Sequence, residues 1–166
     1  MKKVILSLAI VAIAFTANAQ DAKKSSDQPF KFGAGALIGL PLGDLGDVAS
    51  LAYGADLQGE YAAAETVGIT LSAGYLRFAG KSGFTVTGGL IPVLAGVRVY
   101  FADKIYGSAQ LGMSFSTESG GGSAFTYAPG VGYKVSDNFD LLLKYQAASK
   151  SGSTTSFIGV RAGFTF

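Results

Sequence analysis

The last eleven residues, SFIGVRAGFTF (156–166), carry the pattern that decides the fold. Ile158, Val160, Ala162, Phe164 and Phe166 occupy every second position, and glycine, arginine or threonine stands between them. Because successive side chains of a β-strand point to opposite faces, this stretch predicts a strand with one apolar face and one face of glycine and polar groups. What the apolar face contacts therefore determines the class of protein.

The same alternation recurs along the chain, between short segments rich in turn-forming residues. Eight stretches predict strands: 30–40, 51–62, 66–78, 84–101, 105–117, 124–135, 139–149 and 156–166. They recur about every 17 residues from residue 30 to the last residue. This spacing leaves no room for the helices that connect parallel strands, so the connections are expected to be antiparallel hairpins.

The predicted connections fall into two classes that alternate along the chain. Segments 63–65, 102–104 and 136–138 are tight, whereas the segments between them are mostly longer and richer in glycine and serine: 41–50, 81–83, 118–123 and 150–155. Short turns at one end and longer loops at the other are typical of an up-and-down barrel in a membrane. An even number of strands also places both ends of the barrel chain on the side of the short turns.

The two faces of the predicted strands differ in chemistry. One face repeats large apolar side chains on every strand and carries no charge in the strand centres, whereas the other holds the charges, amides, hydroxyls and many of the 24 glycines. An eight-stranded interior is too narrow for the apolar set. We therefore predict an all-β, eight-stranded antiparallel up-and-down transmembrane β-barrel, closed and with its apolar face toward lipid. A soluble barrel with the apolar face inward is the alternative.

The first residues predict an export signal. Lys2 and Lys3 precede the apolar run 4–15 and the small-residue sequence Ala17-Asn18-Ala19, which is the pattern of a signal peptide over residues 1–19. Residues 20–29 are then a mobile polar tail, and residues 30–166 the barrel. Without the two leader lysines the chain has 11 cations and 11 acids, so its charge balance argues against a nucleic-acid-binding protein.

The inward-facing charges form the main candidate site. We expect a lumen charge network made by Asp56, Glu60, Arg98, Lys134, Lys144 and Arg161. In it, Asp56 and Glu60 neutralise part of the charge of Arg98, Arg161 and Lys144, because unpaired buried ions are costly. The network is either a plug of salt bridges or the lining of a narrow water-filled path. With Lys31 and Asp140 the inward face has five cations and three acids, so such a path would favour anions.

Glycines and prolines predict local features of the wall. Glycines 33, 35 and 39 share the inward face and are expected to leave room for long side chains from the far wall. Pro92 and Pro129 lie within predicted strands and lack the N–H that a strand ladder needs. We expect a bulge over residues 88–92 and an irregularity at Pro129.

The composition disfavours catalysis. The chain has no histidine and no cysteine, so it cannot form a serine–histidine pair, and a zinc site is improbable. We therefore expect no enzyme activity, no cofactor and no metal. Arg77 and Lys81 lie near the outer rim and are either lipid head-group contacts or ordinary exposed cations.

The amphipathic strands, the leader and the closing GVRAGFTF resemble the small eight-stranded outer-membrane barrels, similar to outer membrane protein X and the membrane domain of outer membrane protein A. The resemblance implies a monomer in the bacterial outer membrane, in contact with lipid and lipopolysaccharide, with Phe164 and Phe166 as the signal read by the barrel-assembly machinery. It implies a structural or small porin-like protein. The alternatives are an adhesion or binding barrel that acts through its outer loops, although these are short here, and more distantly a lipid-modifying enzyme.

Overall fold

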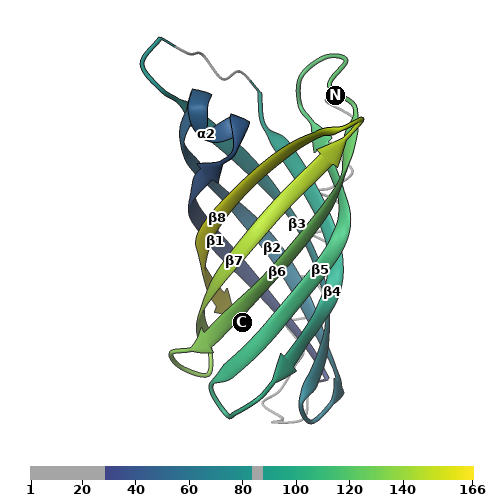
Figure 1. Ribbon diagram of the computed structural model, residues 1–166. Coiled ribbons are helices and arrows are strands. Elements are labelled where there is room, and N and C mark those ends of the chain that lie inside the picture. Colours follow the sequence, from purple (N-terminus) through teal and green to yellow (C-terminus); the bar gives the residue numbers. More distant parts are fainter. Residues whose placement is uncertain (1–28, 84–87) are drawn as a thin grey trace.

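The protein forms a closed barrel of eight antiparallel strands (Figure 1). The computed structural model describes residues 29–83 and 88–166. The strands are β1 (Phe30–Leu42), β2 (Ala49–Ala64), β3 (Val67–Gly80), β4 (Leu90–Tyr100), β5 (Ile105–Ser116), β6 (Ser123–Lys134), β7 (Phe139–Lys150) and β8 (Ser153–Thr165). Each strand pairs with the next, and β1 pairs with β8 to close the wall. This confirms the predicted fold class.

The two ends of the barrel differ, as Figure 1 shows. At one end, called the turn end here, tight connections follow β2, β4 and β6. At the other, the loop end, the β1–β2 connection contains the short helix α2 (Asp44–Val48). In the parts of the chain that the structure describes, no helix is long and apolar enough to cross a membrane.

The β7–β8 connection corrects one prediction. Segment 150–155 was expected to be a longer loop, but β7 runs to Lys150 and β8 begins at Ser153. Ser151 and Gly152 alone make the turn, with φ angles of 48° and 85°. Positive φ at both central residues is the geometry of a tight hairpin turn whose twist matches the strands. The alternation of short and long connections is therefore broken here.

Strand pairing is interrupted near Pro92 and Pro129, but the register of the paired strands does not change. Between β3 and β4 the register is the same on both sides of Pro92, with Ala73 opposite Val93 and Leu76 opposite Leu90. The expected bulge is therefore absent from this part of the described chain. Between β6 and β7 the paired residues stop at Tyr127 and resume at Gly130, so the irregularity predicted at Pro129 is confirmed. The fourth strand was predicted to begin at residue 84, but residues 84–87 lie outside the described residues.

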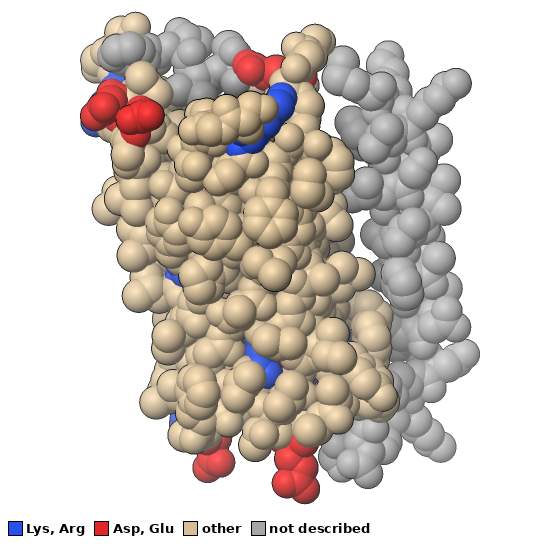
Figure 2. All heavy atoms as spheres, turned by 45° about the vertical axis from the view of Figure 1, so that its right-hand side comes forward, with Lys and Arg blue, Asp and Glu red and all other residues tan. Residues whose placement is uncertain are grey.

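The outer wall is apolar in the middle and charged at its rims. Large apolar side chains of all eight strands point outward and are exposed, Leu57, Leu71, Leu111 and Leu143 among them. Figure 2 shows this wall as a broad tan surface, with acidic atoms at its upper and lower edges. The inward positions of the strands hold many glycines, the amides and most of the charges that lie within strands. This is the arrangement that the strand parity predicted.

Candidate functional site in the barrel interior

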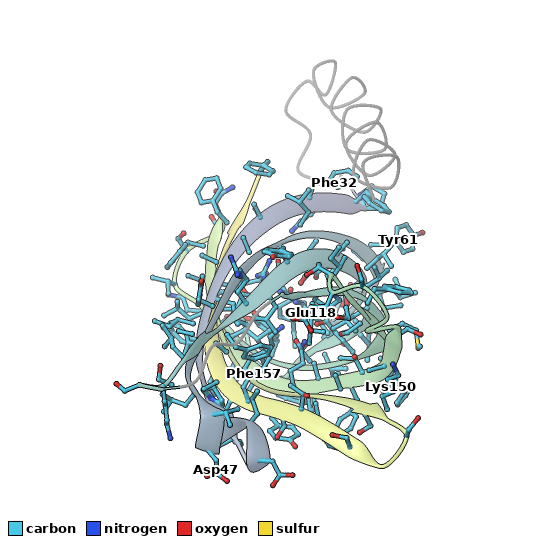
Figure 3. All side chains as sticks on the ribbon, turned by 90° about the horizontal axis from the view of Figure 1, so that it is seen from above. Phe32, Asp47, Tyr61, Glu118, Lys150 and Phe157 are labelled. Carbon is cyan, nitrogen blue, oxygen red and sulfur yellow. The ribbon has the colours of Figure 1, made fainter. Side chains whose placement is uncertain are left out.

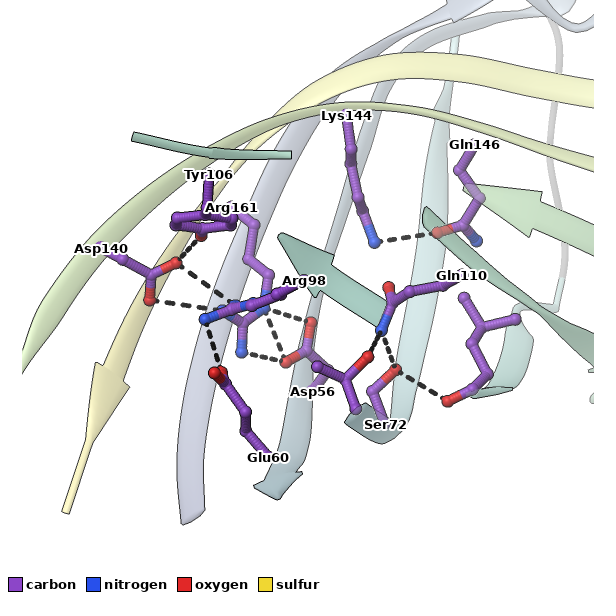
Figure 4. A network of polar contacts seen from close by, with 12 residues as sticks. Asp56, Glu60, Ser72, Arg98, Tyr106, Gln110, Asp140, Lys144, Gln146 and Arg161 are labelled. Carbon is purple, nitrogen blue, oxygen red and sulfur yellow. Dashed lines mark hydrogen bonds and ion pairs between the residues drawn. The ribbon is translucent and has the colours of Figure 1, made fainter. Parts of the chain in front are cut away.

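Inward side chains fill the described interior in layers along the barrel axis. An ion-pair network lies toward the turn end, amides and hydroxyls occupy the middle, and an apolar cluster lies toward the loop end. Figure 4 shows the first two layers, and Figure 3, seen from above, shows Phe157 of the third inside the ring of strands.

Arg98 on β4 is the centre of the network. Only 5% of its surface is exposed, and its guanidinium lies 3.0 Å from Glu60 Oε2 and 3.4 Å from Asp140 Oδ2. Its Cζ atom lies 4.5 Å from the centre of the Tyr106 ring, and the Tyr106 hydroxyl donates to Asp140. The Tyr100 hydroxyl donates to Glu60 Oε1 over 2.9 Å. Two acids and two tyrosines thus hold one buried cation, as a low-dielectric site requires.

Arg161 on β8 forms the second part of the network. Its Nε and Nη2 atoms donate to Asp56 on β2, at 2.9 Å and 2.6 Å from Oδ1. A weaker contact of 3.9 Å joins it to Asp140. Asp140 therefore bridges the two buried arginines. The guanidinium fits because Gly35 and Gly163 have no side chain, since a Cβ at either position would overlap it. Gly35 therefore makes room for a long side chain, but that side chain comes from the neighbouring strand β8 and not from the far wall as predicted.

The two lysines of the predicted network lie outside the ion pairs. Lys144 is buried and donates to Gln146 Oε1 over 2.9 Å; among the described residues no carboxylate lies within 4.0 Å of its ammonium group. Glu60 and Asp56 form their ion pairs with Arg98 and Arg161. The Lys134 ammonium lies 4.4 Å from the centre of the Tyr100 ring instead of pairing with an acid. The aromatic face provides a cation–π contact in place of a carboxylate.

The middle layer is held by neutral groups. Gln110 Nε2 donates to Ser72 Oγ over 3.2 Å, and the Thr126 hydroxyl donates to Ser114 Oγ over 2.7 Å. Both pairs are buried, so each hydrogen bond satisfies groups that would otherwise lose their contact with water.

An apolar cluster fills the interior below the loop end. It contains Leu37, Ala49, Ala52, Leu76, Phe78 and Phe157, and Leu45 of α2 and Leu90 pack against it. The Phe78 and Phe157 rings meet edge to face, with centroids 6.4 Å apart. The sequence predicted a polar, glycine-rich lumen and did not predict this cluster. Its members other than Ala49, which lies beyond a register shift at the start of β2, have inward parity, but apolar residues that lie far apart along the chain give no sign that they meet at one level.

Two cavities lie at the turn end. One, of about 20 Å³, lies beside the network and is lined by Arg98, Arg161, Glu60 and Asp140 among others. It has room for about one water molecule. The other, of about 410 Å³, opens outward from Lys31, Glu60 and Lys134. Among the described residues, no three acidic side chains gather as a metal site would require.

The remaining predicted residues lie on the outside. Arg77 points outward from β3, opposite Tyr53 on β2. Lys81 donates to the carbonyl of Gly46 in α2, so its ammonium already has a partner. Phe164 and Phe166 are exposed, Phe166 by 76%, and their rings lie 5.8 Å apart.

Sequence reasoning missed Asp140 and Tyr106 as members of the network. Both have inward parity on β7 and β5, which is the signal that could have found them. Tyr106 lies on β5, next to the β4 strand of Arg98, whereas Asp140 lies on β7 and reaches Arg98 across the lumen, which depends on strand tilt and register. Glycine at position 132 gave a further sign, since a Cβ there would overlap the Tyr106 ring.

Solved structures similar to this one are outer-membrane barrels. The attachment invasion locus protein Ail of Yersinia pestis has a TM-score of 0.58 at 17% identity, with 82% of this chain and 97% of Ail covered. The N-terminal barrel of OprF from Pseudomonas aeruginosa has a TM-score of 0.56 at 15% identity, with 84% and 98% covered. Neisserial surface protein A has a TM-score of 0.52 at 14% identity, with 84% and 98% covered.

The similarity to these structures supports the fold, and a match to a family profile supports the assignment of the chain to a protein family. No curated protein matches the sequence significantly. The sequence profile of the outer membrane protein beta-barrel domain matches residues 7–166, which is nearly the whole chain. This family indicates an integral protein of a bacterial outer membrane. The chain belongs to the outer membrane protein beta-barrel domain family.

Proposed function

We propose that the protein is a structural barrel whose interior is closed to solutes. The observation that carries this proposal is the succession of filled layers. The Arg98–Asp140–Arg161 network occupies the turn half, and the cluster around Phe157 occupies the loop half. A dissolved ion would have to displace both paired charges and packed rings, and each displacement is costly.

Planar-bilayer recordings test this proposal against the porin-like alternative. We expect no conductance above that of the protein-free bilayer, with insertion verified by recovering the folded barrel from the membrane. A steady anion-selective conductance that falls in Arg98→Glu or Arg161→Glu would favour the porin-like function, because these cations would then line the path.

A surface-interaction function is the second candidate, favoured by the charges of the loop end. Asp44 and Asp47 of α2 are exposed, whereas Lys81 and Lys150 donate to backbone carbonyls of Gly46 and Gly121. The related Ail barrel has been solved in complex with a heparin analogue, sucrose octasulfate. Here the exposed acids disfavour such a polyanion and favour a cationic partner.

Charge reversal tests the surface function. Cells that display the protein are compared with cells that display Asp44→Lys/Asp47→Lys for adhesion to polylysine-coated and heparin-coated surfaces. A cation-binding loop end predicts that the reversal weakens adhesion to polylysine. Equal adhesion of both cell types would exclude the α2 acids as a binding surface.

We infer further that the protein is not an enzyme. The chain has no histidine, and the buried arginines and acids satisfy one another instead of facing a substrate. A lipid-modifying activity is the distant alternative. Incubating the folded barrel with phospholipid and lipopolysaccharide and analysing the lipids by mass spectrometry tests it, and we expect unchanged lipids.

We also propose a route to the membrane. Residues 1–19 are removed as a signal peptide, residues 20–29 remain as a polar tail, both ends of the barrel chain lie in the periplasm, and the barrel is a monomer. Exposed Phe164 and Phe166 support recognition by the barrel-assembly machinery. Mass spectrometry of the purified protein is expected to find Gln20 at its start, and Phe166→Ala is expected to lower the amount of folded barrel in the membrane.

Lipid contact is proposed at one rim residue. Arg77 is exposed on the lipid side and can meet the phosphates of lipopolysaccharide, whereas Lys81 is held by Gly46. Arg77→Gln is therefore expected to weaken lipopolysaccharide retention during purification more than Lys81→Gln does.

A further inference from the structure

The turn end opens into a hollow that the closed-barrel function does not use. It has a volume of about 410 Å³ and lies between the β2–β3 and β4–β5 connections and the mouth of the lumen. It is lined by exposed Lys31 of β1 and by half-buried Glu60 of β2, Tyr100 of β4 and Lys134 of β6. Four strands thus bring polar groups to one concave surface.

The two cations of this hollow lack acidic partners. In the described chain, neither Lys31 nor Lys134 has a carboxylate within 4.0 Å. Glu60, which faces Lys31 across the β1–β2 ladder, is already bound by Arg98 and by the Tyr100 hydroxyl. Lys134 is held over the Tyr100 ring, which positions its ammonium group without neutralising its charge.

More positive charge lies behind the hollow. The smaller cavity of about 20 Å³ shares Lys31 and Glu60 with it and reaches Arg98 and Arg161. Arg98 Nε is buried and has no hydrogen-bond partner among the described residues. Buried donors normally find an acceptor, so this part of the structure favours an incoming oxygen atom. The acids Glu65 and Asp103 also line the hollow from the turns, and like Lys31 they are exposed, so water screens their charges, whereas Lys134 is half-buried.

We propose that this hollow binds a small oxyanion, a carboxylate or a phosphate, between Lys31 and Lys134. Each ammonium group donates a charge-assisted hydrogen bond to the ligand, and Glu60 stays paired with Arg98. The deeper arginines add attraction without leaving their own partners. The acids in the turns limit the charge of the ligand, because a large polyanion would meet them at the entrance. The binding site is independent of whether the barrel conducts.

Nuclear magnetic resonance of the mature barrel in micelles tests the proposal. Lysine labelled at Cε and Nζ is titrated with inorganic phosphate and, separately, with acetate, each to about 20 mM, which exceeds a millimolar Kd. Sodium chloride keeps the ionic strength constant. We expect saturable shifts of the Lys31 and Lys134 signals, and the probe that saturates at the lower concentration identifies the preferred oxyanion.

Two variants test whether the binding depends on Lys31 and Lys134. Lys31→Gln/Lys134→Gln is expected to lower the affinity at least about tenfold, since it removes two charged hydrogen bonds. Lys104→Gln is the matched control, because Lys104 is exposed at the same end of the barrel and does not line the hollow. Its affinity should stay within about twofold. Circular dichroism verifies that each variant is folded.

Two results would overturn the proposal. One is the lack of any saturable lysine shift with either probe in the folded wild-type protein. The other is an equal loss of affinity in Lys104→Gln, which would indicate a general attraction of anions to this end of the barrel.

Discussion

Asp140 links the two halves of the ion-pair network, because it contacts both buried arginines and Tyr106. Asp140→Asn leaves Arg98 and Arg161 with one acid each. We expect the variant to lower the free energy of unfolding by about 1–3 kcal/mol, because buried charged contacts are weakened while each arginine keeps one acid. Urea unfolding in detergent, followed by circular dichroism, measures the change.

The exposed turn residue Asp137 provides the control. Asp137→Asn removes the same charge where water already solvates it, so its effect should stay within about 0.5 kcal/mol. Equal losses in the two variants would indicate that Asp140 acts through net charge and not through its contacts.

Gly132 is the position where a single methyl group should disturb the network. A Cβ there would overlap the ring of Tyr106, which is completely buried and cannot move aside. Gly132→Ala is expected to destabilise the barrel by about 1–3 kcal/mol through overpacking. Gly59→Ala is the control, because its Cβ would lie 3.3 Å from the edge of the exposed Phe30 ring, which has room to shift. Thermal unfolding that affects both variants equally would refute the steric argument.

At the scale of single residues, the sequence predicted which face of the wall a side chain occupies better than which residues it contacts. Parity placed Arg98, Arg161, Asp56 and Glu60 inside, and the structure joins them in pairs. Lys144 shows the limit of that reasoning. It shares the inward face with the acids, yet its nearest partner is Gln146, two residues along its own strand. Parity gives the face of a side chain but not its height along the barrel or its distance across the lumen.

At the scale of elements, alternation predicted all eight strands, while their ends depended on turn chemistry. Segment 150–155 contains serine, glycine and threonine, which also occur in longer loops, and only the positive φ of Ser151 and Gly152 distinguishes the tight turn. The apolar cluster could not be predicted from the alternation either. Leu37, Phe78 and Phe157 come from three strands and meet only once the register is set.

Pro129 offers a test of the strand ladder. The pairing lost near it lies on the β7 side, and proline has no N–H to restore it. Pro129→Val is expected to extend the β6–β7 ladder and to stabilise the barrel by up to about 1 kcal/mol. Hydrogen exchange should show a slowly exchanging amide at position 129. Pro129→Ala separates the added N–H from the larger side chain, and rapid exchange in both variants would contradict the expectation.

At the scale of the whole molecule, the exposed apolar wall predicts how the barrel responds to charge. Leu111 lies at the middle of β5 and is 58% exposed. Leu111→Arg is expected to cost about 2–4 kcal/mol of folding free energy in phospholipid vesicles, the range for a cation at the bilayer midplane. Ile105→Arg, at the turn end of the same strand, should cost about 0–1 kcal/mol. Equal costs would mean that β5 does not span the bilayer as its outward face indicates.

The pair of Arg161 and Asp56 has a consequence for the order of assembly. The two residues are 105 positions apart and belong to β8 and β2, so they meet only when the last strand closes the wall against β1. A contact made after the rate-limiting transition state slows unfolding but does not speed folding. Asp56→Asn should therefore accelerate unfolding by on the order of tenfold or more and leave the folding rate within about twofold. Equal changes in both rates would place barrel closure early. If only unfolding is accelerated, the Arg161–Asp56 contact gives the inserted barrel kinetic stability, because it slows separation of β8 from β1.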